Sequence, residues 1–340
     1  MGRKNKNYSK TLHQQTYEKL VGLQAFGESK AAAKKDGTYK EKIFSFTTYQ
    51  TYWKHIKYFI KWMQKEHPEC TTLKAAKKYV NTFLETRTAL GLSAWTVSLE
   101  CAALCKLYGI APDDPKRFQP PQRRRQDIRR SRVETVRDRH FSVTNNAELI
   151  EFVKGTGTRR NVLERLEGRD LWSREQMLLE VSSLEGKQNL SAKEKNHLAT
   201  LKDALETFPD EDWFIHHRRD KGGRYRFAII CSKRKDKIIE RFQNTPPNDM
   251  VWYHVPGAMD VHNLRAQYAA AVYKKYARKI SDIPYDRVNR GSGRRFQSEV
   301  YYCRRDESGK RLDKKAMMKT SKALGHARLD VIAYSYLYNI

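Results

Sequence analysis

The stretch Ser321-Lys-Ala-Leu-Gly-His-Ala-Arg-Leu-Asp-Val-Ile-Ala-Tyr-Ser-Tyr-Leu-Tyr338 holds a histidine directly after a glycine and then a cluster of tyrosines. We expect two helices around it, over Asp313–Leu324 and Leu329–Tyr336. Two distant segments, Thr156-Gly-Thr-Arg159 and His262-Asn-Leu-Arg265, carry side chains of complementary chemistry. Guanidinium forks, imidazoles that move protons and an oxygen nucleophile form the set that phosphate chemistry uses. The sequence therefore predicts that these segments meet at a DNA backbone.

Composition and charge indicate a folded protein that binds nucleic acid. The chain has 340 residues, of which 39% are hydrophobic, which is enough for packed cores in two domains or more. Lys and Arg number 67 against 39 Asp and Glu, giving a formal net charge of +28. Such an excess is the electrostatic signature of a nucleic-acid binder. The aromatic fraction of 11% argues against a disordered basic tail.

The cysteines and the absence of long apolar runs in the sequence limit the kinds of protein that this chain could be. The five cysteines are odd in number and form no CxxC pair, so we expect neither a disulfide framework nor a zinc site. We expect no metal and no cofactor. The first residues lack the apolar core of a signal peptide, and no run of 18 apolar residues is present. These features predict a protein of a reducing compartment that contains DNA.

The first part of the chain is predicted to be a basic arm followed by a helical domain. Residues 1–44 are polar and basic and are expected to form a partly ordered arm. Residues 45–110 are expected to form a small all-helical domain. From Thr47 on, aromatic and aliphatic residues recur at three- and four-residue steps, which predicts an amphipathic helix. Its outer face carries Lys54, Lys57 and Lys61, which either contact DNA or form a solvated face.

Two more helices are expected in this domain. One lies near Leu73–Leu84, and the other starts after Ser93 as N-cap and stops at Gly109.

A proline-rich and then arginine-rich segment, residues 111–140, is predicted to be an interdomain linker. Between residues 115 and 139 it carries ten Lys and Arg against three acidic residues. Such a tether could lie along DNA phosphates or remain a flexible solvated linker, and the two interpretations are compatible. The candidate DNA contacts here are Arg123, Arg124, Arg125, Arg129 and Arg130.

Residues 141–340 are predicted to form a second domain that is mainly α with a small β-hairpin or sheet. A hairpin is expected from Trp213 to Ile230, turning at Lys221-Gly-Gly with Arg224 following as a further DNA contact. Helices are expected on both sides of it. They include one that begins with a Ser191/Glu194 capping box and one over residues 260–279 capped by Asp260. A segment over 281–312 is expected to be looser.

Five separated motifs, taken in order, resemble the tyrosine recombinases, the phage-integrase-like enzymes. They are Thr-Gly-Thr-Arg159, Asp-Lys221-Gly-Gly-Arg-Tyr-Arg, His262-Asn-Leu-Arg265, Leu-Gly-His326 and Tyr336, which stands ten residues after that histidine. Each motif alone is weak, and their order in a chain of +28 net charge is the stronger signal. The resemblance covers residues 141–340 as a mixed α/β catalytic domain. It also implies an upstream helical core-binding domain, which periodicity indicates independently for 45–110.

The resemblance implies a role for each residue of the set. Arg159 and Arg265 would clamp the non-bridging oxygens of the scissile phosphate. His262 would act as general base on Tyr336, the nucleophile, and His326 would donate a hydrogen bond to the phosphate. Lys221 would protonate the leaving 5′ oxygen. The product would be a 3′-phosphotyrosine link, which a free 5′-hydroxyl then attacks.

Alternatives stay open for several of these residues. Tyr334 and Tyr338 compete with Tyr336 as nucleophile, and Lys233 or Lys235 competes with Lys221. His326 could instead be an ordinary residue after a helix C-cap. The family usually has an acid three residues after the first arginine, where this chain has Val162. We therefore expect support for Arg159 from elsewhere, with Asp170 as the candidate.

The expected function is site-specific DNA recombination by the integrase or transposase of a mobile element. By the resemblance, it acts as a homotetramer on double-stranded DNA, with an accessory DNA-bending protein, in the cytoplasm of a bacterium on the nucleoid. A resolvase or topoisomerase-like enzyme of the same active-site class is one alternative. A non-catalytic basic DNA-binding protein and an RNA-binding or ribosomal protein are the others.

Overall fold

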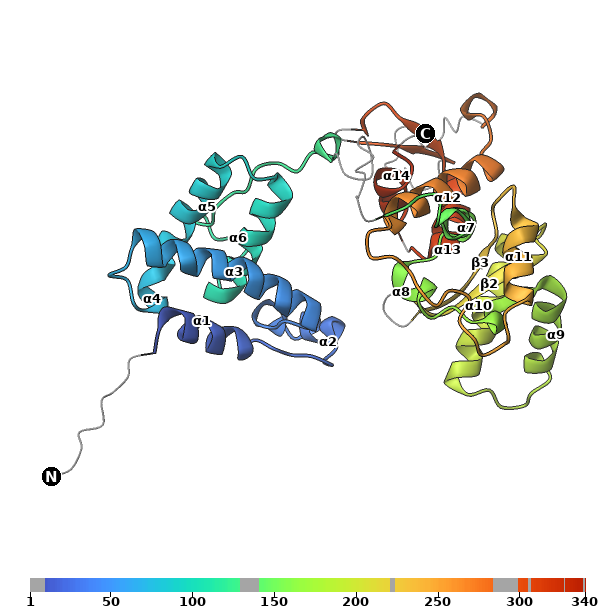
Figure 1. Ribbon diagram of the computed structural model, residues 1–340, viewed down its shortest axis with the longest axis horizontal. Helices are drawn as coiled ribbons and strands as arrows, with labels where there is room; N and C mark the ends of the chain where they lie inside the picture. The colour runs from blue at the N-terminus through green and yellow to red at the C-terminus, as the bar shows by residue number, and fades with distance from the viewer. Residues whose placement is uncertain are drawn as a thin grey trace. The chain divides into compact units, whose positions relative to one another are not determined.

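The computed structural model describes residues 10–128, 141–220, 224–283, 299–304, 307–326, 328–338 and 340, with the backbone alone at 126, 219 and 224. The chain divides into two compact units, Met1–Arg124 and Arg125–Ile340, drawn from blue to green and from green to red in Figure 1. Among the described residues, no helix combines the length and the apolar character needed to cross a lipid bilayer.

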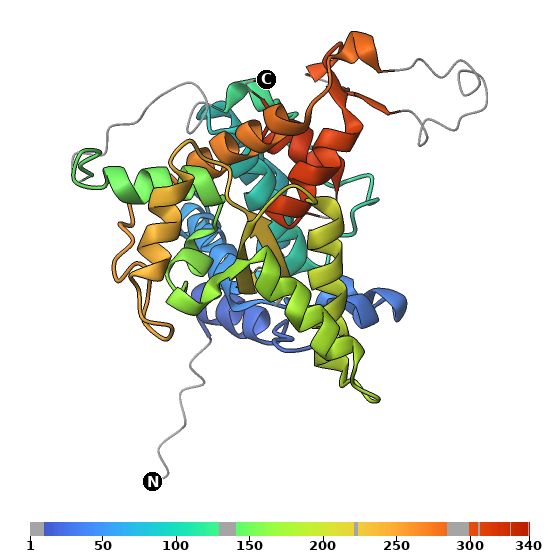
Figure 2. The same cartoon turned by 90° about the vertical axis from the view of Figure 1, so that its right-hand side faces the viewer.

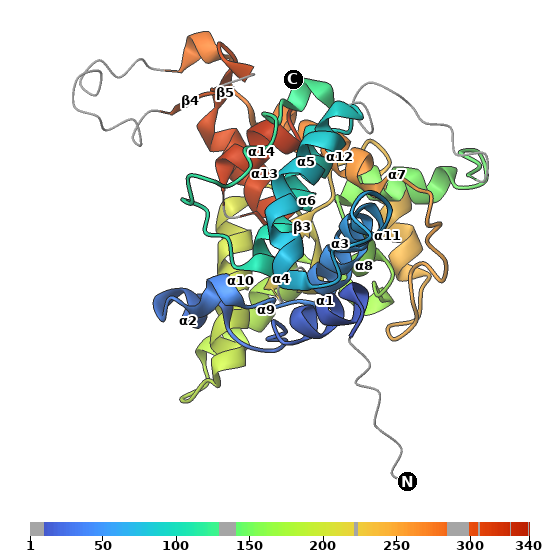
Figure 3. The same cartoon turned by 90° about the vertical axis from the view of Figure 1, so that its left-hand side faces the viewer.

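The N-terminal unit is a bundle of helices around one apolar core. Its helices are α1 (Leu12–Val21), α2 (Lys30–Lys35), α3 (Phe46–Glu66), α4 (Leu73–Ala76), α5 (Val80–Ala89) and α6 (Ala94–Tyr108). Helix α3 packs against α6 and α5, and the three helices are labelled in Figure 3. The buried side chains of α3 that face them include Ile56, Phe59 and Met63. This inner face is the one that the aromatic periodicity predicted.

Local sequence signals set the ends of α6. The Ser93 hydroxyl accepts a hydrogen bond from the Thr96 amide at 3.2 Å, and Gly109 ends the helix in the left-handed region at φ 63°. This confirms the predicted helix. The helix expected near 73–84 is instead broken into α4, a 3-10 turn over Lys77–Tyr79 and α5.

The described part of the predicted arm, residues 10–44, does not form an arm. Leu12 and Leu20 of α1 are buried in the same core as α3, and so is Ile43. The Ile43 amide donates to the Leu23 carbonyl at 2.7 Å, which closes a loop around α2. Leu12, Thr16 and Leu20 recur every four residues, and all are buried. A short apolar helix pattern around Tyr17, Leu20, Val21 and Leu23 is visible in the sequence, but the polar and basic composition of the segment favoured an arm.

The N-terminal unit also extends into the predicted linker. Phe118 packs against its core, and the Asn81 side chain donates to the Lys116 carbonyl at 2.9 Å. The boundary between the units therefore falls at residue 124.

The C-terminal unit is mostly helical around a small antiparallel sheet, as expected. The sheet has the order β1 (Leu171–Ser173), β2 (Trp213–Asp220) and β3 (Arg224–Ile229), and a separate ribbon pairs β4 (Val300–Tyr302) with β5 (Arg311–Asp313). The β2–β3 hairpin is the predicted one. Its register shifts between His217 and Asp220, while its predicted turn, 221–223, lies outside the described residues. The ribbon lies in the segment that was expected to be loose.

Eight helices of this unit fall within the described residues. They are α7 (Ala147–Thr156), α8 (Arg160–Leu163), α9 (Arg174–Glu185), α10 (Ala192–Thr207), α11 (Lys235–Gln243), α12 (Val261–Tyr276), α13 (Lys314–Leu324) and α14 (Leu329–Ser335). Helix α12 packs against α7 and α13, and α10 covers β3 (Figure 2). The predicted capping box at Ser191 and Glu194 is present, and the Asp260 side chain caps α12 by accepting from the Asn263 amide at 3.1 Å.

Candidate active site

Arg159 follows the tight end of α7. Gly157 lies in the left-handed region at φ 59°, where the Tyr268 ring fills the space that a Cβ would need. Tyr268 is itself buried and donates from its hydroxyl to the Ile229 carbonyl at 2.8 Å. Only glycine suits both the backbone angle and the contact. The chain then leaves α7 in an extended conformation at Arg159 and enters α8.

Arg265 lies in the first turns of α12, three residues after His262, and joins two other segments. Its side chain is 2% exposed. One guanidinium nitrogen donates to the Gly157 carbonyl, and Nη2 donates to the Leu324 carbonyl at 3.3 Å. Burial lowers the pKa of Arg265 from its ordinary value, but a guanidinium stays charged at neutral pH. The residue therefore fixes the ends of α7 and α13 around a buried positive charge.

His326 is fixed by the end of α13. Gly325 takes φ 71°, the His326 amide donates to the Ser321 carbonyl at 2.9 Å, and the Ser321 hydroxyl donates to the His326 carbonyl at 2.8 Å. These bonds satisfy the last turn of the helix. The backbone of His326 is therefore fixed by the hydrogen-bonded C-terminus of α13, and this fixes where its imidazole starts.

Tyr336 is the C-cap of α14, and its amide donates to the Ile332 carbonyl at 3.2 Å. The next residue, Leu337, is fully buried in the core of the unit. This anchor holds the Tyr336 side chain, which is itself 6% exposed.

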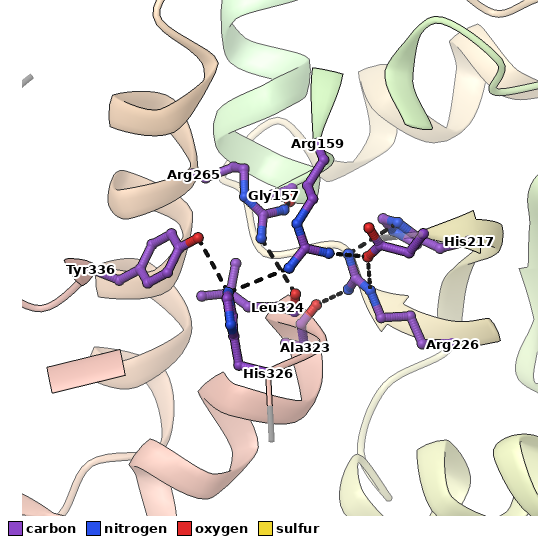
Figure 4. Close-up of polar contacts among 10 residues, drawn as sticks. Gly157, Arg159, His217, Arg226, Arg265, Ala323, Leu324, His326 and Tyr336 are labelled. Carbon is purple, nitrogen blue, oxygen red and sulfur yellow. Dashed lines mark hydrogen bonds and ion pairs between the residues drawn. The ribbon is translucent and has the colours of Figure 1, made fainter. Parts of the chain in front are cut away.

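These segments bring five of the six predicted catalytic residues together, and we call Arg159, His262, Arg265, His326 and Tyr336 the candidate cluster. In Figure 4 the His326 ring lies between Tyr336 and Arg159. Its Nε2 atom is 3.2 Å from the Tyr336 hydroxyl and 3.4 Å from Arg159 Nη2. The His262 and His326 rings each lie 5.2 Å from the Tyr336 ring, centroid to centroid. The sixth residue, Lys221, lies outside the described residues.

Arg265 completes the surroundings of the tyrosine. Its guanidinium carbon lies 5.7 Å from the Tyr336 ring centroid. One guanidinium and two imidazoles thus adjoin the phenol, and the second guanidinium, that of Arg159, contacts His326.

The other two tyrosines near the end of the chain are placed differently. The Tyr334 hydroxyl accepts from the Arg304 amide at 2.7 Å and lies 3.2 Å from the Arg304 carbonyl, to which it donates. Its ring also lies 4.5 Å below the Arg125 guanidinium. Tyr338 packs, half-buried, against the core of the unit. Of the three, Tyr336 is the tyrosine whose hydroxyl lies within 3.2 Å of His326.

The carboxylate that supports Arg159 is Asp220, and the prediction of Asp170 is wrong. Arg159 Nη1 donates to Asp220 Oδ2, whereas Asp170 Oδ1 lies 2.7 Å from Arg218 Nε. Asp170 lies beyond the short α8, which ends at Leu163. Strand β2 delivers Asp220 instead.

Arg226 and His217 complete a buried network behind Arg159 and were missed as functional candidates. Arg226 Nε lies 2.9 Å from Asp220 Oδ2, and Nη2 lies 3.0 Å from His217 Nδ1. Arg226 is the last residue of the motif Asp-Lys221-Gly-Gly-Arg-Tyr-Arg, and Asp220 is the first. Their place in one motif was the only sequence feature that linked Asp220 and Arg226 to the candidate cluster. A buried ion pair, however, cannot be inferred from spacing alone.

The electrostatics keep His326 neutral. Burial, and then the positive charges of Arg159, Arg265 and Arg226, lower the pKa of His326 to about 4. A guanidinium only donates hydrogen bonds, so Nε2 facing Arg159 is assigned as the unprotonated nitrogen. That nitrogen can accept the proton of the Tyr336 hydroxyl.

The candidate cluster suits an anion. A guanidinium has five N–H donors, so Arg159 and the buried Arg265 can each offer phosphate oxygens a further N–H beyond the bonds described, and the imidazoles can exchange a proton with the phenol. Among the residues described, no group of three His, Cys, Asp or Glu side chains could hold a metal ion.

The predicted DNA contacts are only partly described. Lys54, Lys57 and Lys61 are exposed on α3, and Arg123 and Arg124 are exposed at the end of the N-terminal unit. Arg125 is half-buried and lies over the Tyr334 ring. Arg129 and Arg130 lie outside the described residues, and only the backbone of Arg224 is described, at the start of β3.

A comparison with the models of known protein families finds no match for this chain, and a search of curated proteins finds none either.

Proposed function

We propose that this chain is a site-specific DNA recombinase of the tyrosine recombinase type, which cleaves and rejoins DNA through Tyr336. The observation that carries the proposal is the placement of His326 Nε2, 3.2 Å from the Tyr336 hydroxyl and 3.4 Å from Arg159. These side chains come from α7–α8, α13 and α14, segments far apart in sequence. A phenol, a neutral imidazole and fixed guanidinium groups are the parts needed to transfer a phosphodiester.

The reaction proposed is a transesterification. The Tyr336 oxygen forms a bond to phosphorus as the bond from phosphorus to the 5′ oxygen breaks. Arg159 and Arg265 bind the non-bridging oxygens, where negative charge accumulates. The loss of one such fixed donor costs about 10²–10³ in rate. Attack by a free 5′-hydroxyl reverses these steps and restores the tyrosine.

Two imidazoles are available for the tyrosine proton. His262 was expected as the base, with His326 donating to the phosphate. The 3.2 Å contact makes His326 the hydrogen-bond acceptor of the Tyr336 hydroxyl in the DNA-free state, because its lowered pKa keeps the ring neutral there. The same lowered pKa makes it a weaker base than His262 was expected to be. Lys221 stays the predicted donor of a proton to the 5′ oxygen.

The N-terminal unit is proposed to be the core-binding domain, which binds the duplex through the lysine face of α3. Its exposed Lys54, Lys57 and Lys61, together with a net charge of +28 over the chain, support this role. Assembly as a homotetramer on two duplexes, help from a DNA-bending protein and action as the integrase of a mobile element are parts of the same proposal. They rest on the sequence resemblance.

The test is a covalent adduct. The protein is incubated with labelled duplexes taken from the DNA that flanks its own gene, nicked at staggered positions so that the short fragment with the freed 5′-hydroxyl diffuses away and the labelled strand stays joined to the protein. We expect a labelled protein band that withstands SDS and is lost on protease treatment. Tyr336→Phe should give no band. Tyr334→Phe is the matched control and should keep it, since the Tyr334 hydroxyl binds the Arg304 backbone.

Other outcomes count against the proposal. DNA binding by the unsubstituted protein without any adduct on these duplexes would favour the non-catalytic alternative. Tighter binding to structured RNA than to duplex DNA in competition would favour an RNA-binding protein. An adduct that survives in Tyr336→Phe would overturn the choice of nucleophile.

A further inference from the structure

A buried carboxylate behind the candidate cluster holds two arginines at once. Asp220 Oδ2 accepts from Arg159 Nη1 and lies 2.9 Å from Arg226 Nε. Asp220 is 4% exposed and Arg226 is 7% exposed, whereas the Arg159 side chain keeps 18% of its surface exposed. Arg159 is therefore held from behind while its free edge faces His326.

Arg226 binds three different groups through three nitrogens. Nε bonds Asp220, Nη1 donates to the Ala323 carbonyl, and Nη2 lies 3.0 Å from His217 Nδ1. Since a guanidinium can only donate, Nδ1 of the fully buried His217 must accept. Burial, with the charge of Arg226 second, lowers the pKa of His217 well below its ordinary value, which keeps it neutral. A lysine has one nitrogen and cannot reproduce this planar fork.

The same arginine fixes the backbone that presents His326. Ala323 lies in the last turn of α13, and a Cβ on Gly325 would lie 2.7 Å from Cδ and Nε of Arg226. The helix end thus packs directly on the Arg226 side chain. A shift of Arg226 would move both the partner of Arg159 and the support of His326.

We propose that Asp220, clamped by Arg226, is the positioning carboxylate that aims Arg159 at the scissile phosphate. Both residues act through Arg159 and His326 and touch no substrate. Removing the carboxylate leaves the buried Arg226 and the partly buried Arg159 without their shared counter-charge, so Arg159 turns away. A misplacement of about 1 Å costs about 10²-fold in rate. The catalytic consequence rests on the proposed function, whereas the orientation of Arg159 does not.

The first test is a double-mutant cycle on the rate of adduct formation. Asp220→Asn is expected to lower the rate by about 10- to 100-fold in the unsubstituted background. In the Arg159→Ala background it should have almost no further effect, because the two changes remove the same function. Asp170→Asn is the matched control, since Asp170 is an equally buried carboxylate paired with another arginine, Arg218. Equal losses for Asp220→Asn in both backgrounds would overturn the proposal.

Asp220→Glu is a second test, in case Asp220→Asn fails to fold. It keeps the buried charge but moves the carboxylate by one methylene, so we expect near-normal thermal unfolding and a rate at least ~10-fold lower. Arg226→Lys should show a similar loss, while Arg218→Lys should not. Adduct formation by Asp220→Glu at the normal rate would overturn the proposal.

A spectroscopic readout separates this inference from the proposed function. In protein with ¹⁵N-labelled arginine, the guanidinium signals of Arg159 are identified by their loss in Arg159→Ala. They should be distinct and slow to exchange in the unsubstituted protein and broadened in Asp220→Glu. Unchanged signals in Asp220→Glu would overturn the positioning role. If the unsubstituted protein forms no adduct at all, the proposed function fails, while this measurement still decides the orientation of Arg159.

Discussion

The Nε2 atom of His326, which follows the C-cap of α13, lies 3.2 Å from the hydroxyl oxygen of Tyr336, the C-cap of α14. The left-handed backbone of Gly325 positions His326, and the buried Leu337 positions Tyr336. The pair is therefore fixed by the fold before any DNA is present. Fixed groups need little rearrangement when charge develops, which is the main advantage of a preorganised site.

The two imidazoles can be distinguished by substitution with glutamine, which keeps a polar amide but cannot carry a proton. If His326 takes the tyrosine proton, His326→Gln should lower adduct formation by about 10²–10⁴, the usual contribution of a general base. Adduct formation after a jump in pH, followed on gels, measures the effect. His262→Gln is the comparison, and a larger loss there would restore the base assignment made from the sequence.

Arg159→Ala should raise the pKa of His326 toward 6.5. That pKa is about 4 because of burial and, next, the charge of Arg159. Removing the charge stabilises the protonated imidazole. The ring signals of His326, followed by NMR as a function of pH, measure the shift. Arg169→Ala is the matched control, because Arg169 pairs with Glu167 at 2.7 Å and is half exposed. An unchanged His326 titration in Arg159→Ala would mean that the Arg159 charge does not lower this pKa.

Stability in acid should improve when His216 is replaced by phenylalanine. The buried His216 ring stacks on Phe227 at 4.4 Å, its Nε2 has no hydrogen-bond partner among the described residues, and burial lowers its pKa to about 3. The unfolded chain binds this proton near pH 6.5, but the folded chain binds it only near pH 3. Unfolding therefore takes up a proton between these values, and stability falls as the pH falls.

The expected gain of His216→Phe relative to the unsubstituted protein is about 2 kcal/mol between pH 6.5 and about pH 5. Thermal or urea unfolding across this range measures it. Parallel stability curves for the two proteins would contradict the prediction. His217, also buried and with a lowered pKa, remains in both proteins, so some acid sensitivity should persist.

Gly325→Ala should reduce adduct formation far more than it reduces stability. The substitution places a Cβ at φ 71°, 2.7 Å from Arg226, and the left-handed backbone alone costs about 1–2 kcal/mol. Gly309→Ala is the matched control, since Gly309 lies at φ 92° with nothing within 4 Å of its Cβ position. Gly309→Ala should lose only the backbone cost in thermal unfolding, and Gly325→Ala should lose more because its Cβ meets Arg226. Only Gly325→Ala should lose about 10-fold or more in adduct formation, through displacement of His326.

Periodicity and capping predicted the local structure well. The helix from Ala94 to Tyr108, the aromatic inner face of α3, the β2–β3 hairpin and the Ser191 capping box all follow from residues close in sequence. Such features depend on neighbours within about one turn, so one segment contains the whole signal. The packing of α1 escaped prediction because its three buried residues are spread over a polar segment.

The network behind Arg159 shows what local sequence cannot give. Asp220 and Arg226 belong to opposite strands of a hairpin whose register shifts between His217 and Asp220, and this irregularity decides which side chains meet. The predicted partner Asp170 is equally buried, but it pairs with Arg218. The sequence does not show whether Asp170 or Asp220 pairs with Arg159, and only the tertiary structure decides between them.

The lysine face of α3 should account for a measurable part of the salt dependence of DNA binding. Lys54, Lys57 and Lys61 recur at three- and four-residue steps and are exposed, so they can follow one strand of phosphates. Each phosphate contact contributes about 0.9 to the slope of log K against log salt. Replacing all three with alanine should therefore lower the slope by up to about 2.7. Fluorescence anisotropy with a labelled duplex at several salt concentrations measures it.

The matched control is a triple alanine variant of Lys30, Lys34 and Lys35 on α2, which removes the same charge from exposed positions of the same unit. We expect its slope to stay close to that of the unsubstituted protein. Equal loss of slope in the two triple variants would mean that net charge, and not the α3 face, determines binding. An unchanged slope in the α3 variant would remove this face from the DNA contact altogether, and the proposed binding role of the N-terminal unit would then have to rest on its other basic residues, Arg123 and Arg124 first.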